Sequence, residues 1–186
     1  MSRRPRILSD ASVAIARLTA RNRSAAASEG YADEEDDLQD RWESLYRECR
    51  DKIYRSACML VGGHDAEEIV QEAFERAMRG PEFFTRIQNP GGWLRVVAAR
   101  QALSRLRRQQ RWHGVQALLR PSATPERDVD LGQALTRLPA NQRTAVVLRY
   151  YHGLEYAEIA SVLGVSANAV GPILTRARTT LREALR

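Results

Sequence analysis

The stretch from Asp65 to Met78 constrains the fold more than any other, because its apolar residues recur every three or four positions. These apolar positions are Ile69, Val70, Ala73, Phe74, Ala77 and Met78. That spacing is typical of an α-helix with one buried side. The opposite side carries Glu67, Glu68, Gln71, Glu72 and Glu75. This acidic side is either a solvated surface or the docking face for a basic partner, and the rest of the chain has to decide between them.

The size and charge of the chain narrow the class of protein. Its 186 residues suffice for two small helical domains with modest cores. The 29 basic and 23 acidic residues give a net charge of +6, which is compatible with a polyanionic partner. No apolar run approaches the length of a membrane span, and the N-terminus lacks the apolar core of a signal peptide. We therefore expect a cytoplasmic protein without membrane insertion.

Residues that could hold a metal or a cofactor are not grouped in the sequence. Cys49 and Cys58 lie nine positions apart, which places them on opposite sides of a helix and argues against a disulfide. The three histidines are scattered, with no cysteines or carboxylates at metal-ligand spacing. No phosphate-binding loop or nucleophile–base pair is recognisable. The sequence predicts no metal, no cofactor and no catalytic residue, and therefore no enzyme.

The N-terminal part of the chain changes character near Leu38. Residues 1–38 combine a basic piece with an acidic block at 33–37, and they are predicted to be a disordered extension because they offer too little apolar surface for a core. From Leu38 apolar residues return at helical spacing as far as Gly62. Asp65 is the expected N-cap of the acidic helix, which should end near Gly80.

A further helix, expected from Trp93 to Arg111 after a turn at residues 89–92, contains six arginines and no acidic residue. One narrow arc of it carries Trp93, Arg100, Ser104, Arg107 and Arg111, and the other arginines include Arg105 and Arg108. Unpaired like charges repel each other unless phosphates neutralise them, so nucleic-acid binding is the favoured interpretation. A separate stripe of Val96, Ala99, Leu103 and Leu106 is expected to pack on the preceding helices.

Residues 112–130 contain prolines and mixed polar residues, and they are predicted to be a flexible linker. Beyond it we expect helices at 131–138, 141–151 and 156–163, and a fourth that Ser166 caps and that runs towards Leu185. Ala160, Gly164 and Val170 have helix-turn-helix spacing, with a plain helical hairpin as the alternative. The expected fold is all-α, with two small helical domains joined by a flexible linker, the second being a helix-turn-helix.

Several short motifs, in order over both domains, resemble the compact extracytoplasmic-function (ECF) group of bacterial sigma factors, which keep only regions two and four. In region two, expected at residues 39–111, the motifs are Ala57-Cys-Met-Leu-Val-Gly62, Asp65-Ala-Glu-Glu-Ile-Val-Gln-Glu-Ala-Phe74, Trp93-Leu94 and Arg105-Leu-Arg-Arg108. In region four, expected at residues 131–186, they are Leu135-Thr-Arg-Leu-Pro139, Gln142-Arg143, Val147-Leu-Arg149, Glu158-Ile-Ala160, Leu163-Gly-Val-Ser166 and Arg176-Ala-Arg178.

The resemblance implies a factor that binds core RNA polymerase and directs promoter recognition, promoter melting and transcription initiation. Docking on the beta-prime clamp would use Asp65, Glu67, Glu68, Gln71, Glu72 and Phe74. The minus-ten element would meet Trp93, Arg100, Ser104, Arg105, Arg107, Arg108 and Arg111. The minus-thirty-five element would meet Ser166, Ala167, Asn168, Ala169, Ile173, Arg176 and Arg178, and region four would also contact the beta flap. An anti-sigma factor is a further implied partner.

This chain departs from the family pattern at several positions. Arg100 and Ser104 stand where family members usually carry Asn and Asp. The helix after Ser166 contains Gly171 and Pro172, which predict a kink, because proline inside a helix costs about 3 kcal/mol and glycine about 1 more. We hypothesise relaxed or altered minus-thirty-five specificity, with Ile173 meeting a thymine methyl or a protein partner. The alternative function is a free-standing helix-turn-helix regulator that acts without polymerase.

Overall fold

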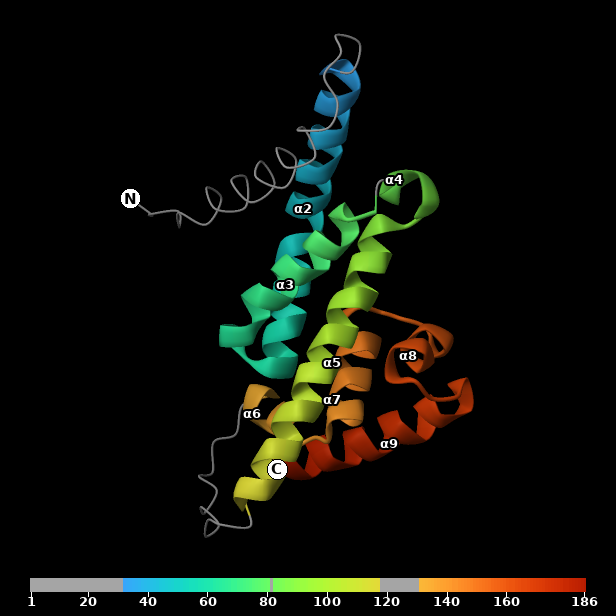
Figure 1. The fold of residues 1–186 in the computed structure, drawn as a ribbon. Coiled ribbons are helices and arrows are strands. Elements are labelled where there is room, and N and C mark those ends of the chain that lie inside the picture. The colour runs from blue at the N-terminus through green and yellow to red at the C-terminus, as the bar shows by residue number, and fades with distance from the viewer. Residues whose placement is uncertain (1–31, 81, 118–130) are drawn as a thin grey trace, which may run out of the picture.

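The computed structural model describes residues 32–80, 82–117 and 131–186, and every regular element in those ranges is helical, which confirms the all-α prediction. The first group of elements comprises α2 (Ala32–Val61), α3 (Gly63–Met78), α4 (Phe83–Arg86) and α5 (Pro90–Ala117). The second comprises α6 (Leu131–Thr136), α7 (Ala140–Val146), the π-helical turn η1 (Val147–Tyr151), α8 (Tyr156–Leu163) and α9 (Ala167–Ala184). In Figure 1, α5 lies between α2 and α3 on one side and α7, α8 and α9 on the other.

The expected boundaries of the flexible segments shift in the structure. Helix α2 begins at Ala32, so residues 32–38 belong to a helix and not to a disordered extension. Helix α5 continues to Ala117, so it includes the first residues that were assigned to the linker. The rest of the predicted disordered extension, residues 1–31, and the rest of the predicted linker, residues 118–130, lie outside the described residues.

Two predicted helix starts were wrong for local reasons. Helix α3 begins at Gly63, because Gly62 takes a φ of 89° and turns the chain directly from α2 into α3. Asp65 therefore lies in the first turn and is not the N-cap. Helix α5 begins at Pro90, a residue that suits the first helical position because no N–H is needed there. The backbone N of Gly92 donates to Oδ1 of Asn89 at 2.8 Å, so residues 89–92 form the capped start of the helix.

The first core packs α2, α3 and α5 together and includes Phe83 of α4. Ile53 and Leu60 of α2, Ile69 of α3 and Leu94 of α5 are all essentially inaccessible to solvent. Trp42 stacks on Phe83 of α4 with ring centroids 5.1 Å apart. The predicted apolar stripe of α3 is confirmed, since Ile69, Val70, Ala73, Phe74 and Ala77 are all buried, whereas Met78 is half-buried.

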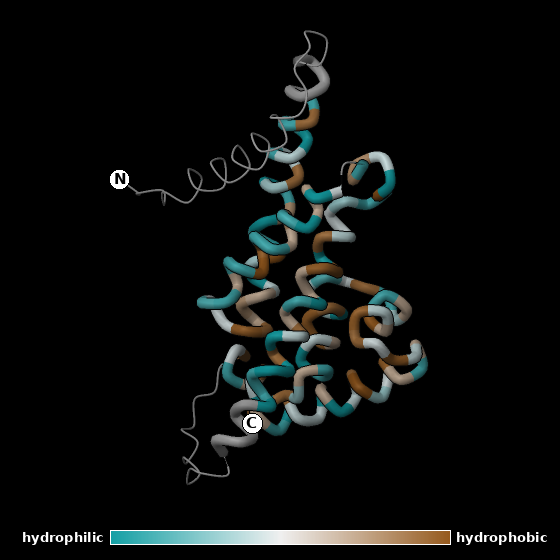
Figure 2. The backbone as a smooth tube through the Cα atoms, in the orientation of Figure 1, coloured by the Kyte–Doolittle hydropathy of each residue, from teal (hydrophilic) through white to brown (hydrophobic). Residues whose placement is uncertain are grey.

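The second core lies between the two groups of helices, which the sequence did not predict. Ala99, Leu103 and Leu106 of α5 were expected to pack on the preceding helices, but they form one buried cluster with residues of α7, η1, α8 and α9. The second group contributes Ala140, Ala145, Leu148, Leu154, Ile159, Ala160, Val162, Leu163, Val170 and Leu174. In Figure 2, hydrophobic residues gather where α5 meets these helices. Helix α5 thus has apolar residues on two sides and is shared by both cores.

Helices α8 and α9 form the predicted helix-turn-helix. Gly164 ends α8 with a φ of 70°, as its position in the motif requires, and Ser166 is the N-cap residue of α9. Helix α9 is continuous through Pro172, near its N-terminal end, so the expected kink does not interrupt it. Within the described ranges no single helix is long and apolar enough to cross a membrane, and α8 and α9 reach that length and composition only as a pair bent by 88°.

His152, at the end of η1, gives the fold a dependence on pH. Its burial, together with the positive charges of Arg95 on α5 and Lys52 on α2, lowers the pKa of the imidazole to about 4. Because protonation is harder in the folded state, the contribution of neutral His152 is fully present above pH 6.5 and is lost as the pH falls from about 6.5 to about 4.

We expect the free energy of unfolding to fall by up to about 3 kcal/mol over this pH window for the wild type. The variant His152→Gln cannot gain the proton and should show a smaller fall. Urea unfolding at a series of pH values measures both slopes. Equal slopes for the two proteins would contradict the assignment to His152.

Candidate nucleic-acid interface

The acidic face of α3 is mostly exposed, as expected, but one of its predicted members is not on the surface. Glu67, Glu68 and Gln71 are exposed, and Asp65 and Glu72 are half-buried. Phe74 is 4% exposed, and its ring centroid lies 4.9 Å from that of Tyr46 in the core. Phe74 therefore supports the acidic face from beneath and cannot itself touch a partner.

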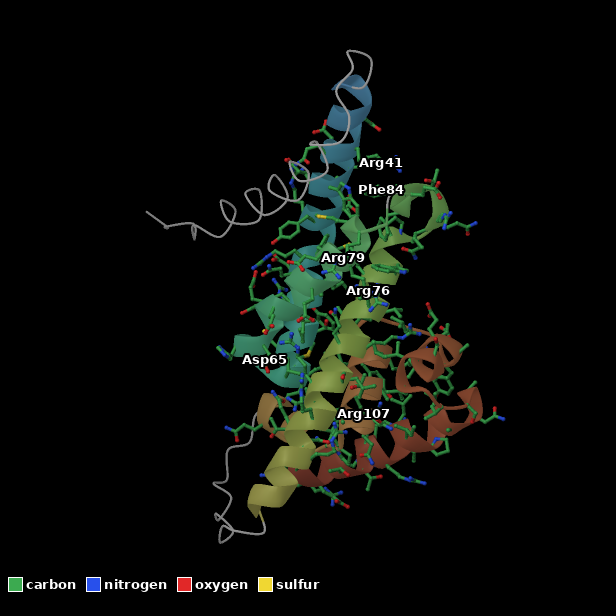
Figure 3. All side chains as sticks on the ribbon, in the orientation of Figure 1. Arg41, Asp65, Arg76, Arg79, Phe84 and Arg107 are labelled. Carbon is green, nitrogen blue, oxygen red and sulfur yellow. The ribbon has the colours of Figure 1, made fainter. Side chains whose placement is uncertain are left out.

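The acidic face is held in place by basic and amide side chains from both neighbouring helices. Arg50 on α2 forms an ion pair with Glu67 at 2.9 Å. Arg105 on α5 forms ion pairs with Glu68, at 2.7 Å, and with Glu72. Gln109 Nε2 donates to Oδ2 of Asp65 at 2.8 Å, and Figure 3 labels Asp65 at the start of α3. The carboxylates consequently keep fixed positions while one edge of each remains open to solvent.

Arg105 therefore differs from the other arginines of α5. The sequence suggested that the arginines of this helix lack acidic partners, but Arg105 finds two on α3 and is 13% exposed at its side chain. The hydrogen bond and charge of Arg105 lower the pKa of Glu68, and the same contacts raise the pKa of Arg105. Arg105 is a support for the acidic face and not a free ligand for phosphate.

The remaining predicted residues of α5 divide into an exposed set and a set that faces the second group of helices. Arg100, Ser104, Arg108 and Arg111 are exposed, and Arg107 is half-buried. Trp93 is half-buried, with its ring in edge contact with Phe83 at 5.2 Å, so it serves the first core. Arg100 and Arg107 donate hydrogen bonds to α7 and α8, and Figure 3 labels Arg107 where α5 borders the second group.

The contact of α5 with the second group uses specific polar atoms. Arg100 donates to Oγ of Ser161 at 2.8 Å and to its carbonyl oxygen at 3.3 Å. Arg107 donates to Oδ1 of Asn141 at 2.8 Å and to the carbonyl oxygen of Leu163 at 3.1 Å. Gln110 donates to the carbonyl oxygen of Leu138 at 3.0 Å and accepts from the backbone N of Ala140 at 2.8 Å.

Sequence reasoning missed most of the residues that join the two groups. Asn141, Ser161 and Gln110 could not be identified from the spacing of apolar residues, because that spacing does not reveal which polar side chains bond to another helix. Arg143 was noted only as part of a family motif, yet it is 8% exposed and its Nε donates to the carbonyl oxygen of Met59 at 2.7 Å. Burial lowers the pKa of Arg143.

Helix α9 presents a polar face to solvent. Ser166, Ala167, Asn168, Arg176 and Arg178 are exposed, and Ala169 is half-buried. Ile173 is also half-buried, and part of its side chain packs against the second core. Pro172 is exposed in its place. No three metal-ligating side chains come together in the parts of the chain that the structure describes.

Comparison with known proteins matches both groups of helices. A family model of sigma-70 region 2 matches residues 45–112, and one of sigma-70 region 4 matches residues 128–181. The ECF RNA polymerase sigma factor SigE of Mycolicibacterium smegmatis is 35% identical over 77% of this chain, which spans 61% of that relative's length. The ECF RNA polymerase sigma factor SigL of Mycobacterium tuberculosis is 31% identical over 76% of this chain and 87% of its own length.

One solved structure supports the fold. The sigma factor RpoE of Bartonella quintana, in complex with the anti-sigma factor NepR, has a TM-score of 0.57 to this chain, with 22% sequence identity. The likeness covers 80% of this chain and 96% of that one. The arrangement of helices is therefore one that occurs in a solved protein.

Removal of the guanidinium at position 105 should raise the pKa of Glu68 towards its ordinary value, because that group is the main cause of the lowered pKa. We expect this for Arg105→Gln, measured by NMR titration of the glutamate side chains. The variant Arg108→Gln is the matched control and should leave the pKa of Glu68 much nearer to that of the wild type, since Arg108 is the smallest of the causes. No change on loss of Arg105 would contradict the ion pair.

Proposed function

The chain belongs to the extracytoplasmic-function sigma factors of RNA polymerase, and from this membership we propose which of its surfaces bind the polymerase and which bind the promoter. The main observation in support is that Arg105 of α5 forms ion pairs with Glu68 and Glu72 of α3. These ion pairs fix the exposed acidic face of α3 relative to the exposed arginines of α5. Such a protein makes and breaks no bond. It binds core polymerase in the cytoplasm and directs promoter choice and strand opening.

The polymerase-binding surface comprises Asp65, Glu67, Glu68, Gln71 and Glu72, with Phe74 as its buried support. Its acidic character suits a basic partner surface, for which we propose the beta-prime clamp. Arg50 and Arg105 restrict the motion of the carboxylates, so less side-chain entropy is lost on docking. A free-standing regulator would have no use for this face, and the matches to both sigma regions disfavour that alternative.

The promoter-binding surfaces are proposed on α5 and α9. Ser104, Arg108 and Arg111 are exposed, and the two arginines are suited to the phosphates of the minus-ten strand. The exposed start of α9, at Ser166, Ala167 and Asn168, would enter the major groove of the minus-thirty-five element, and Arg176 and Arg178 would hold its phosphates. The beta flap and an anti-sigma factor remain further proposed partners of the second domain and of the whole chain, respectively.

Charge reversal on the acidic face tests the polymerase assignment. The double variant Glu67→Lys with Gln71→Lys should bind core polymerase at least about tenfold more weakly, because like charges at an interface cost several kcal/mol. Ser44→Lys with Glu48→Lys is the matched control, since it makes the same change of charge at the same spacing on α2. Affinity is measured by fluorescence titration of core polymerase, followed by run-off transcription on genomic promoter fragments. Equal loss in both variants would refute a specific docking face.

Two substitutions on α9 separate base reading from phosphate binding. Asn168→Ala should reduce discrimination at one base pair of the minus-thirty-five element, by about 1–3 kcal/mol, if the amide reads a base edge. Arg176→Ala should weaken binding about equally for all upstream sequences and lower its salt dependence. Transcription from a library of randomised upstream elements measures both effects. Equal use of native and scrambled elements by the wild type would support the relaxed specificity that Gly171 and Pro172 suggest.

A further inference from the structure

We propose that Lys52 on α2, Arg95 on α5 and His152 at the end of η1 form a binding site for a small phosphate-class anion. Free inorganic phosphate and the phosphate groups of a nucleotide are the two sources of this chemistry. The inference goes beyond the proposed function, because none of these residues belongs to the proposed polymerase or promoter surfaces.

The register of α2 against α5 brings Lys52 and Arg95 to the same level. The two helices pack side by side and run in the same direction in Figure 1. Cys49 of α2 lies against Gly91 of α5, where an added Cβ would be only 3.0 Å from Sγ of the cysteine. Lys52 lies about one turn after this contact on α2, and Arg95 about one turn after it on α5. Their positive charges therefore lie near each other along this pair of helices.

The π-helical turn η1 adds His152 from the second group of helices. Helix α2 contacts η1, and Tyr151 at the end of that turn packs against the first core. The backbone N of His152 donates to the carbonyl oxygen of Val147 at 3.2 Å, which is the wider bonding pattern of a π-helix, and such single turns are frequent at functional sites. The charges of Arg95 and Lys52 both act on the pKa of His152, so the three side chains share one neighbourhood.

The polar atoms of these three side chains are not satisfied within the protein. The structure gives none of them a hydrogen bond or an ion pair to another residue of the described ranges. Nε of Arg95 and Nδ1 of His152 are buried without a partner. The terminal nitrogens of Arg95, Nε2 of His152 and Nζ of Lys52 are not buried in this way. These outer nitrogens are therefore available to a ligand.

The neighbouring carboxylates of α2 form their contacts elsewhere. Asp51 pairs with Arg50 at 3.0 Å, and Glu48 accepts a hydrogen bond from Oγ of Ser44 at 3.2 Å. The sequences of α5 and η1 contain no acidic residue. Like charges without a counter-charge repel one another, and a bound anion removes that repulsion.

A phosphate-class anion suits this set of donors. It offers several oxygens, so the guanidinium can bind two of them while the ammonium and the imidazole bind others. Arg95 and His152 are half-buried, whereas Lys52 is exposed, so the site favours a small anion over the backbone of a nucleic acid. The negative charge of the bound anion also favours the protonated form of His152.

The test uses the full chain with isotope-labelled histidine, observed by NMR near neutral pH while inorganic phosphate replaces chloride at constant ionic strength. The ring resonance of His152 should shift and saturate, whereas that of the exposed His64 should change little. Lys52→Gln should bind phosphate about tenfold more weakly, because a hydrogen bond between charged groups is lost. Arg47→Gln is the matched control, since it removes an exposed positive charge from another side of α2.

The pKa of His152 supplies a second readout. Phosphate should raise this pKa from about 4 towards its ordinary value, because the bound anion offsets the charges of Arg95 and Lys52. In chloride, Arg95→Gln should itself raise the pKa of His152, since Arg95 has the larger effect of the two charges. The same variant should lose most of the further rise that phosphate causes in the wild type.

Adenosine diphosphate, titrated in the same way, identifies the source of the anion. Tighter binding than that of inorganic phosphate at the His152 resonance assigns the site to a nucleotide, and equal or weaker binding assigns it to free phosphate. The site is overturned if neither probe gives a saturable shift of that resonance, or if Arg47→Gln weakens binding as much as Lys52→Gln. A shift with single-stranded DNA alone would also overturn it, in favour of a promoter contact.

Discussion

The burial of helix α5 on two opposite sides is the constraint on which the rest of the structure depends. Leu94, Val97, Ala98 and Ala102 face the first core, whereas Leu103 and its neighbours face the second. A helix with apolar residues on two sides needs two partners, and here each partner is a separate group of helices. The polar residues of α5 occupy the part of its surface that neither core covers, and they include Arg105, Arg107 and Arg108.

The different surroundings of this polar surface explain why arginines of one helix have different roles. Arg105 points to α3 and fixes the carboxylates of the acidic face. Arg107 points to α7 and α8, and Arg108 is exposed. The role of an arginine therefore depends on its position on α5: it supports a protein-binding surface, contacts the second domain or remains free for phosphate. This division couples the proposed polymerase and promoter surfaces through a single rigid element.

Much of the local structure could be predicted from the sequence, whereas the long-range contacts could not. The acidic helix, the turn at Gly164 and the helix-turn-helix follow from spacing and from the conformational freedom of glycine. Periodicity identified the stripe with Leu103 as buried, but it cannot say which element covers it. Phe74 was predicted to be a surface contact from family position alone, and its apolar side chain packs inwards instead, whereas Ile173 is half-buried. The assignments of DNA and polymerase contacts remain predictions.

The double burial of α5 also determines where the chain can be divided. A fragment that ends after α5 would retain every buried residue of the first core except Val147 of η1, yet the side of the helix with Ala99, Leu103 and Leu106 would face solvent. A contiguous apolar surface of that kind favours self-association. The second domain, expressed alone, would expose those apolar residues of the second core that α5 covers. Each half thus covers an apolar surface of the other, so the pair is the natural unit for expression.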